Sequence, residues 1–307
     1  MNMKKWLSSF VLASALLLSA CGEEESKTIT QAEGDFPITL TDALGKDVTV
    51  EKAPEKVVSL IQSNTEILFA LGLEDEVVGV NDFDNYPPEV EGKERIGSME
   101  YNVEKIIALQ PDIVFAHESG TYGFEAGIEQ LEAVGIDVFV VKNAVTFEET
   151  YETIEEIGQL TGKVAEAEEI NADIAEKLEE VQAKIEGQPA KSAFLLVGAT
   201  PSLYAAGTNT FMDEMLKAIH VNNVVQVEGW PEYSAEDFVA SNPDTIIVTY
   251  AEDVTTLKNN PAFANMTAIQ QDALKIVDGD TTSRQGPRLA EGVESMAKAM
   301  YPEAFGE

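Results

Sequence analysis

One pattern occurs twice in this chain and constrains its fold more than any other feature. Residues 102–113 (NVEKIIALQPDI) align without gaps with residues 234–245 (SAEDFVASNPDT). Each copy has an Asn or Ser suited to cap a helix, a Glu at the second helical position, a helical stretch, a Pro-Asp turn and a strand. Two similar lobes explain this repeat economically. The alternative is coincidence between two copies of a common unit.

Short β-branched runs alternate with helical stretches along the chain. The sequence Ser63-Asn64-Thr65-Glu66 has the pattern of a capping box, which predicts a helix through Leu71 that Gly72 ends. Alternating strands and helices are typical of mostly parallel sheets, so we expect an α/β fold built from two Rossmann-like lobes. The runs that we interpret as buried strands are Val57–Leu60, Val77–Val80 and Ile113–Ala116.

The segment from Gly162 to Gly187 separates the two halves. It contains no proline and no internal glycine, and its apolar stripe at helical spacing consists of Ile174, Leu178, Val181 and Ile185. One helix of about 35 Å is therefore predicted to join the lobes. The expected divisions are a leader at 1–20, a tether at 21–36, a first lobe at 37–161, the linking helix at 162–187 and a second lobe at 188–307.

The first residues have the layout of an export signal. Lys4 and Lys5 precede an apolar stretch, Trp6–Leu18, that is too short for an ordinary transmembrane helix. Small residues then lead to Cys21, the only cysteine, in a pattern similar to the bacterial lipobox, whose cysteine carries a lipid. Polar sequence directly after Cys21 disfavours the alternative of a buried thiol. We expect cleavage before Cys21 and a lipid anchor on the extracytoplasmic face of the cell membrane.

The composition is strongly acidic. Lys and Arg number 20 against 55 Asp and Glu, which gives a formal net charge of −35. Such a surface repels nucleic acid and anionic lipid head groups, so neither is expected as a partner. Because 44% of the residues are hydrophobic and fall in periodic segments, the body is nevertheless expected to fold as a globular protein.

Common enzyme motifs are missing from the sequence. It has no G-x-S-x-G, H-E-x-x-H, G-x-x-x-x-G-K or G-x-G-x-x-G pattern. A solvated acidic face explains most carboxylates more simply than a catalytic pair does. His117 and His220 are the only histidines, which argues against a site for bare zinc or manganese. We therefore expect neither an enzyme nor a resident cofactor or metal.

Several blocks of the sequence together resemble a known family: Lys56–Leu60, Ser63–Glu66, Phe69–Gly72, Val78–Val80, Tyr86–Pro88, Asn102–Ala116, Trp230–Pro231, Ser234–Glu236 and Arg284–Arg288. From about Pro54 to the C-terminal helix it resembles the class III periplasmic binding proteins, which serve ABC importers of iron-siderophores, haem and vitamin B12. The resemblance implies two α/β lobes joined by one helix, a ligand in the cleft between them, and a monomer that delivers this ligand to a permease dimer with its ATPase.

Within this family the chain is most similar to the vitamin B12-binding members. Two tryptophans that line the cleft of those relatives fall here on Ser98 and His117, which weakens the B12 assignment. His117 is a candidate axial ligand to a haem iron or cobalt, or a contact to the ligand edge; the alternative is a solvated loop histidine. The resemblance implies ligand contacts at Tyr86, Tyr204, Trp230, Asp280 and Arg284. Weaker candidates are Met99, Tyr101 and Arg288.

These side chains suit a large, flat, partly charged metal chelate. Aromatic rings supply apolar faces, and Arg284 can pair with a carboxylate or phosphate. The alternatives are lobe-core packing for each aromatic residue and a surface ion pair for Arg284. We expect cobalamin, with a ferric siderophore or haem as the close alternative. The rival classes are an enzyme acting on such a chelate and a surface adhesion module.

Glu104 and Glu236 occupy the same place in the two copies of the repeat. A carboxylate at the second helical position stabilises the helix N-terminus, which is one sufficient reason for both residues. The resemblance places them where relatives present glutamates to arginines of a two-subunit permease. Because a roughly two-fold permease needs one matching contact from each lobe, we expect Glu104 and Glu236 to dock there.

Overall fold

The computed structural model describes residues 36–306, which lie in one compact unit, Glu33–Glu307. The leader at 1–20, Cys21 and all but the last residue of the 21–36 tether lie outside the described residues. Within residues 36–306, no helix has the length and apolar character needed to cross a membrane. The body begins with an antiparallel hairpin of β1 (Ile38–Thr41) and β2 (Asp47–Val50).

The first sheet has five parallel strands in the order β5-β4-β3-β6-β7. Its central strands are buried on both faces, which explains their unbroken runs of apolar residues. The strands are β3 (Val57–Ser59), β4 (Val77–Val80), β5 (Glu94–Arg95), β6 (Ile113–His117) and β7 (Asp137–Val141). The helices and 3₁₀ turns between them are α1 (Gln62–Ala70), η1 (Pro88–Gly92), α2 (Val103–Leu109), η2 (Glu118–Gly120) and α3 (Glu125–Ala133).

The second sheet has the order β11-β9-β8-β12-β13, and β10 also pairs with β8. Strands β8, β10, β12 and β13 pair in parallel, whereas β9 pairs antiparallel with β8 and β11. The strands are β8 (Lys191–Gly198), β9 (Leu203–Ala205), β10 (Val221–Asn223), β11 (Glu232–Tyr233), β12 (Thr245–Val248) and β13 (Leu274–Ile276). The predicted α/β fold with mostly parallel sheets is confirmed.

Helices of the second half flank this sheet and continue to the C-terminal end of the described body. They are α6 (Phe211–Ala218), α7 (Ala235–Ser241), α8 (Ala251–Asn259), α9 (Thr267–Gln270), α10 (Gly279–Ser283) and α11 (Leu289–Met300), with the 3₁₀ turns η3 (Pro261–Phe263) and η4 (Pro302–Phe305).

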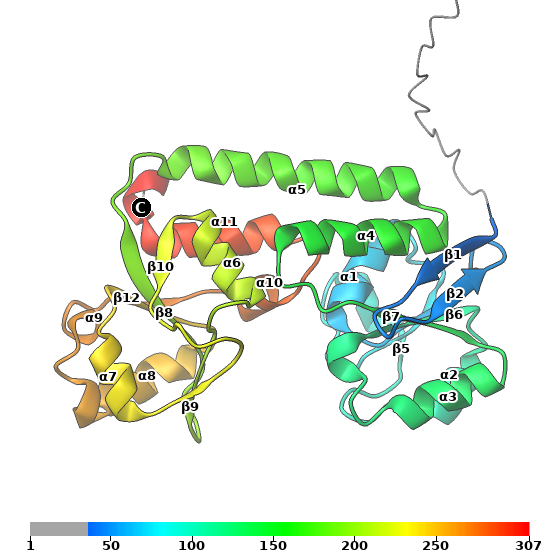
Figure 1. The fold of residues 1–307 in the computed structure, drawn as a ribbon, viewed down its shortest axis with the longest axis horizontal. Coiled ribbons are helices and arrows are strands. Elements are labelled where there is room, and N and C mark those ends of the chain that lie inside the picture. The colour runs from blue at the N-terminus through cyan, green and yellow to red at the C-terminus, as the bar shows by residue number, and fades with distance from the viewer. Residues whose placement is uncertain (1–35, 307) are drawn as a thin grey trace, which may run out of the picture. The chain divides into compact units, whose positions relative to one another are not determined.

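Two consecutive helices, α4 (Phe147–Thr161) and α5 (Val164–Ile185), connect the sheets. The chain turns between them at Gly162, whose φ of 73° lies in the left-handed region that glycine adopts without strain. Figure 1 shows α5 running along both α4 and α11, with the sheets on the other side of these helices. Helix α5 lies within the bounds of 162–187 expected for the linking helix, and its role as the single link between two lobes stays a prediction. The lobe boundaries at 161 and 188 stay a prediction, because one apolar core extends from α4 and α5 into both halves.

The two copies of the sequence repeat adopt the same local structure. Helices α2 and α7 each have seven residues, and each is capped by a side chain, Asn102 or Ser234, that accepts a backbone N–H bond. Each helix ends at a residue in the left-handed conformation, Gln110 with φ of 52° and Asn242 with φ of 31°. A parallel central strand follows in both copies, so the repeat is structural.

The Pro-Asp turn has the same role in both copies. The Asp112 carboxylate accepts backbone N–H bonds from Glu55 and Lys56, directly before β3. The Asp244 carboxylate accepts bonds from the backbone N–H and the hydroxyl of Ser192, at the start of β8. Each aspartate therefore fixes the beginning of the neighbouring strand in its sheet.

The predicted capping box at Ser63–Glu66 is wrong. Helix α1 begins at Gln62, and its N-cap residue, Ile61, makes no side-chain cap bond. Glu66 is buried at 3% exposure, and two arginines from the second half bind its carboxylate. These ionic partners replace the backbone N–H group that a capping-box glutamate would bind.

Candidate ligand-binding cleft

A hollow of about 450 Å³ opens at the carboxyl ends of β8, β12 and β13. In open α/β sheets this edge is where ligand-binding loops gather. Trp230 and Tyr250 supply its aromatic surface, and both are more than half exposed. The other lining residues are Val197, Met212, Thr249, Val277, Asp278, Gly279, Asp280 and Ser283.

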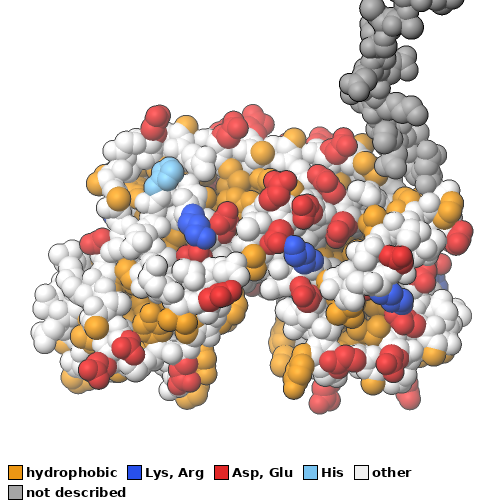
Figure 2. All heavy atoms as spheres, in the orientation of Figure 1, with side chains coloured by type: hydrophobic (Ala, Val, Ile, Leu, Met, Phe, Trp, Pro, Cys, Tyr) orange, Lys and Arg blue, Asp and Glu red, His pale blue; other side chains and the backbone are white. Residues whose placement is uncertain are grey.

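A second hollow of about 270 Å³ lies between the two halves. Asp280 and Ser283 line both hollows, so the hollows are adjacent, and we refer to them together as the cleft. Figure 2 shows the body hollowed between its two lower parts, with apolar side chains on both sides. Ile61, Gln62, Ser63 and Phe83 line the second hollow from the first half, and Arg284 and Gln285 from the second.

Backbone hydrogen bonds hold the loop that carries Trp230. Gly207 donates to the carbonyl of Gly229 at 2.8 Å, and Ala205 donates to that of Pro231 at 3.1 Å. The loop lies so close that a Cβ on Gly207 would come 1.8 Å from the carbonyl oxygen of Val227. Trp230 is therefore presented to the cleft by a loop fixed along the edge of β9.

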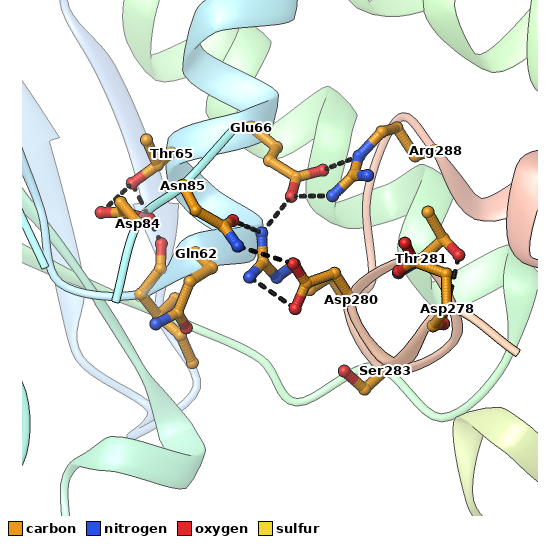
Figure 3. Close-up of polar contacts among 12 residues, drawn as sticks. Gln62, Thr65, Glu66, Asp84, Asn85, Asp278, Asp280, Thr281, Ser283 and Arg288 are labelled. Atoms are coloured by element: carbon orange, nitrogen blue, oxygen red, sulfur yellow. Dashed lines mark hydrogen bonds and ion pairs between the residues drawn. The ribbon is translucent and has the colours of Figure 1, made fainter. Parts of the chain in front are cut away.

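The carboxylate of Glu66, on α1, binds two guanidinium groups of the second half. Its Oε1 accepts from Arg284 Nη1 at 2.7 Å and from Arg288 Nη2 at 2.6 Å, and its Oε2 accepts from Arg288 Nε at 2.8 Å. Figure 3 shows Glu66 and Arg288 facing each other from α1 and from the segment before α11. These charge-assisted bonds connect the two halves beside the cleft.

Arg284 is enclosed by protein groups. Its side chain is 11% exposed, and its Nη2 lies 2.8 Å from Asp280 Oδ1. Its Nη1 also donates to Asn85 Oδ1 at 2.8 Å, and Asn85 Nδ2 donates to Asp280 Oδ2 at the same distance. Arg284 thus has two carboxylate partners, counting Glu66, and is not presented as a free cation.

Asp84 is a buried carboxylate in the loop that carries Phe83 and Asn85 to the cleft. Its Oδ2 accepts from the Thr65 hydroxyl at 3.0 Å and from the Asn81 N–H at 2.8 Å, whereas its Oδ1 has no hydrogen-bond partner among the described residues. Burial raises the pKa of Asp84 from 3.8 to about 6, although these two bonds act to lower it.

His117 is the last residue of β6 and is 4% exposed, so the alternative of a solvated loop histidine is wrong. Its Nδ1 accepts the N–H bond of Ser119 at 3.2 Å and lies 2.8 Å from the Ser119 hydroxyl. Burial lowers the pKa of His117 from 6.5 to about 4, so the ring is neutral at pH 7. His117 is not on the wall of either hollow, and its role as a ligand contact stays a prediction.

Of the residues predicted to contact ligand, the cleft brings together Trp230, Asp280 and Arg284. Tyr86 lies instead beneath Arg288, whose guanidinium carbon is 4.0 Å from the centre of its ring, and lines a separate hollow of about 330 Å³. Tyr204 is on β9, where strand alternation turns it away from the buried side. For all five residues, ligand contact stays a prediction.

The weaker candidates have different surroundings. The Tyr101 hydroxyl donates to the carbonyl of Leu60 at 2.7 Å, and its ring packs edge-on against Phe124, so this tyrosine stabilises the first half. Met99 is almost fully exposed next to Ser98. Arg288 has a defined structural role through Glu66.

Glu104 and Glu236 are both exposed at the second position of α2 and α7, as predicted from the repeat. Sequence reasoning missed Phe83 and Tyr250 as cleft residues. Each lies in the loop after a parallel strand, β4 or β12, and an aromatic residue at that place is a signal that could have identified them.

Comparison with known proteins defines the class. Residues 57–281 match the family model of the periplasmic binding proteins, and this chain belongs to that family. The match covers the strands of both sheets and the first three residues of α10.

Three relatives illustrate the likeness. A Bacillus subtilis (strain 168) protein named as an ABC transporter substrate-binding lipoprotein, YvrC, is 40% identical over 305 residues, which cover 97% of each chain. The vitamin B12-binding protein of Salmonella typhimurium (strain LT2) is 28% identical over 251 residues, 81% of this chain and 91% of its own. The crystal structure of a "possible" iron-binding (periplasmic solute-binding) protein from Staphylococcus epidermidis is 33% identical with a TM-score of 0.75, and the match covers 81% of this chain and 100% of that one.

Proposed function

We propose that this protein is the substrate-binding subunit of an ABC importer and captures a bulky metal chelate, with cobalamin as the favoured ligand. The observation that carries the proposal is the cleft itself. Exposed aromatic rings from both halves, Phe83, Trp230 and Tyr250, line two adjacent hollows at strand carboxyl ends. Such rings offer rigid apolar faces to a planar macrocycle, and neighbouring polar groups can fix its edge.

The relatives support this assignment. One is named as an ABC transporter substrate-binding lipoprotein and another as a vitamin B12-binding protein. A ferric siderophore or haem is the alternative ligand, in line with the Staphylococcus epidermidis structure of 33% identity, which is named as a "possible" iron-binding (periplasmic solute-binding) protein. In either case the metal enters as part of the cargo, and no catalytic step on the chelate is proposed.

Two further elements complete the proposal. A lipid on Cys21 would hold the protein at the extracytoplasmic face of the membrane, as the lipobox-like sequence implies. Glu104 and Glu236 would contact a permease dimer, one from each half. Intact-mass analysis of the wild type and of Cys21→Ala tests the anchor: the lipid mass should be present in the first and absent from the second.

Tryptophan fluorescence of the chain from Gly22 onwards, which lacks the leader and the lipidated Cys21 and keeps the whole compact unit, tests ligand capture. Trp230 is the only tryptophan after Trp6, so in the processed protein it reports on the cleft. Titration with cyanocobalamin should quench this emission saturably, and ferric siderophores and haemin form the comparison panel. Recovery of the unmodified chelate supports a binding protein, and turnover of the chelate would indicate an enzyme. Absence of binding to every chelate would contradict the proposal and favour an adhesion module.

A further inference from the structure

We infer that this cleft selects uncharged or cationic chelates and rejects those that carry free carboxylates. This inference rests on the proposed function and narrows the substrate class of the same site. It separates amide-bearing corrinoids and hydroxamate siderophores, which present no carboxylate, from haem and carboxylate siderophores.

The residues that line the cleft offer no free cation to a ligand. Among the residues that line the two hollows, Arg284 is the only Lys, Arg or His. A guanidinium recognises a carboxylate ligand by offering paired N–H donors. In this protein Glu66 and Asp280 already occupy both terminal nitrogens of Arg284, at 2.7 and 2.8 Å.

The charges around Arg284 balance one another. Arg288 shares Glu66 with it, so two guanidinium groups and the two carboxylates of Glu66 and Asp280 compensate one another. Asp278 then adds a further carboxylate to the wall of the larger hollow. Its Oδ1 accepts the Thr281 N–H at 2.9 Å, and no Lys, Arg or His among residues 36–306 forms an ion pair with it.

The electrostatic field of the whole protein also disfavours an anionic ligand. With a formal charge of −35, the chain repels an approaching anion and attracts a cation. The carboxylates of the cleft and the net charge of the protein therefore both disfavour an anionic chelate. A chelate with a carboxylate would lose solvation in the cleft without gaining a cationic partner, whereas an amide or ammonium group would meet carboxylate, hydroxyl and amide acceptors.

The test uses cobalamin derivatives that differ in one charge. Cyanocobalamin, the monocarboxylic acid made by hydrolysing one propionamide, and the methyl ester of that acid are titrated into the chain from Gly22 onwards. The ester is the matched control, because it lacks the same amide but is neutral. We expect the acid to bind about tenfold more weakly than the ester at low ionic strength. The ratio should shrink at about 0.5 M salt, because salt screens exposed charges.

A second pair tests the same rule on another chelate. Ferrioxamine B, which carries an ammonium group, should bind more tightly than its N-succinyl derivative, which carries a carboxylate. Equal or tighter binding of the carboxylate member in every pair overturns the charge rule and leaves the proposed function standing. Failure of every chelate to bind overturns the proposed function, and the charge rule with it.

The Asp280→Asn variant tests whether Asp280 contributes to the discrimination against carboxylates. It removes one carboxylate and one partner of Arg284, so the ratio of acid to ester dissociation constants should fall towards 1. The ratio is the readout, because Asp280 lines the cleft and either constant alone can change. Glu180→Gln, an exposed position on α5 outside the cleft, should keep the wild-type ratio. A wild-type ratio in Asp280→Asn would contradict the assignment.

Discussion

The carboxylate of Glu66 binds the guanidinium of Arg288 through two hydrogen bonds of 2.8 and 2.6 Å, between residues 222 positions apart in the chain. The same guanidinium lies over the ring of Tyr86, with its carbon 4.0 Å from the ring centre. Arg288 is thus fixed by a carboxylate and an aromatic ring of the first half. The pair connects α1 to the beginning of α11, beside the cleft.

Loss of the Glu66 charge should destabilise the fold. Glu66→Gln keeps the shape of the side chain but leaves Arg288 without its carboxylate and Arg284 with only Asp280. Removing one partner of a buried ion pair costs about 3–5 kcal/mol, so we expect urea denaturation to give a free energy of unfolding lower by about 3 kcal/mol. Glu74→Gln, an exposed residue beyond the same helix, is the control and should change it by less than about 0.5 kcal/mol. Equal stability of the two variants would refute the structural role.

Trp230 should contribute substantially to ligand affinity. An exposed aromatic anchor that ligand covers contributes about 2 kcal/mol, so Trp230→Ala should weaken chelate binding roughly 30-fold. Calorimetry is the measurement, because this variant loses the tryptophan signal. Tyr204→Ala serves as a comparison, since Tyr204 is also an aromatic residue but does not line either hollow. If both variants bind at wild-type affinity, the cleft is not the ligand site.

Stability should depend on pH through Asp84. Its pKa is about 6 in the folded protein and 3.8 ordinarily, so between these values the folded state holds a proton that the unfolded state has lost. The contribution of Asp84 to the free energy of unfolding is fully present below pH 3.8 and is lost as the pH rises through 6. At 1.36 kcal/mol per pKa unit, the loss is about 3 kcal/mol.

The Asp84→Asn variant should lack this loss. Its free energy of unfolding, relative to wild type, should therefore increase by about 2.5 kcal/mol from pH 4 to pH 7.5. The difference between the two proteins is the measurement, because His117, with its lowered pKa, makes stability rise with pH between about 4 and 6.5 in both. A difference that does not vary with pH would show that Asp84 titrates normally.

Charge reversal at Glu104 and Glu236 should separate transport from binding. Both side chains are exposed, so the double Glu→Arg variant should keep its chelate affinity and most of its stability while cellular uptake is lost. Charge pairs of this kind set docking register and association rate. The same double change at Glu168 and Glu179, exposed on α5, is the control and should leave uptake intact. Normal uptake by the first variant would leave helix stabilisation as the role of these glutamates.

Local patterns predicted the architecture well. The caps at Asn102 and Ser234 and the linking helix depend on neighbouring residues, and the sequence contains that information. The Ser-x-x-Glu pattern at Ser63 failed because its glutamate has stronger partners more than 200 positions away. Burial of His117 could not be predicted either, because it depends on tertiary packing around the end of β6, which extends to His117 and not only to Ala116.

The long sequence separation between Glu66 and its arginines has a kinetic consequence. The first sheet closes within Val57–Val141, whereas the Glu66 pairs need residues up to Arg288 to be in place. Closing so long a loop is entropically costly, so we expect these pairs to form late, after the folding barrier has been crossed. Glu66→Gln should therefore speed unfolding and leave the folding rate almost unchanged. Once the fold is complete, the ion pairs of Glu66 with the two arginines therefore slow its unfolding.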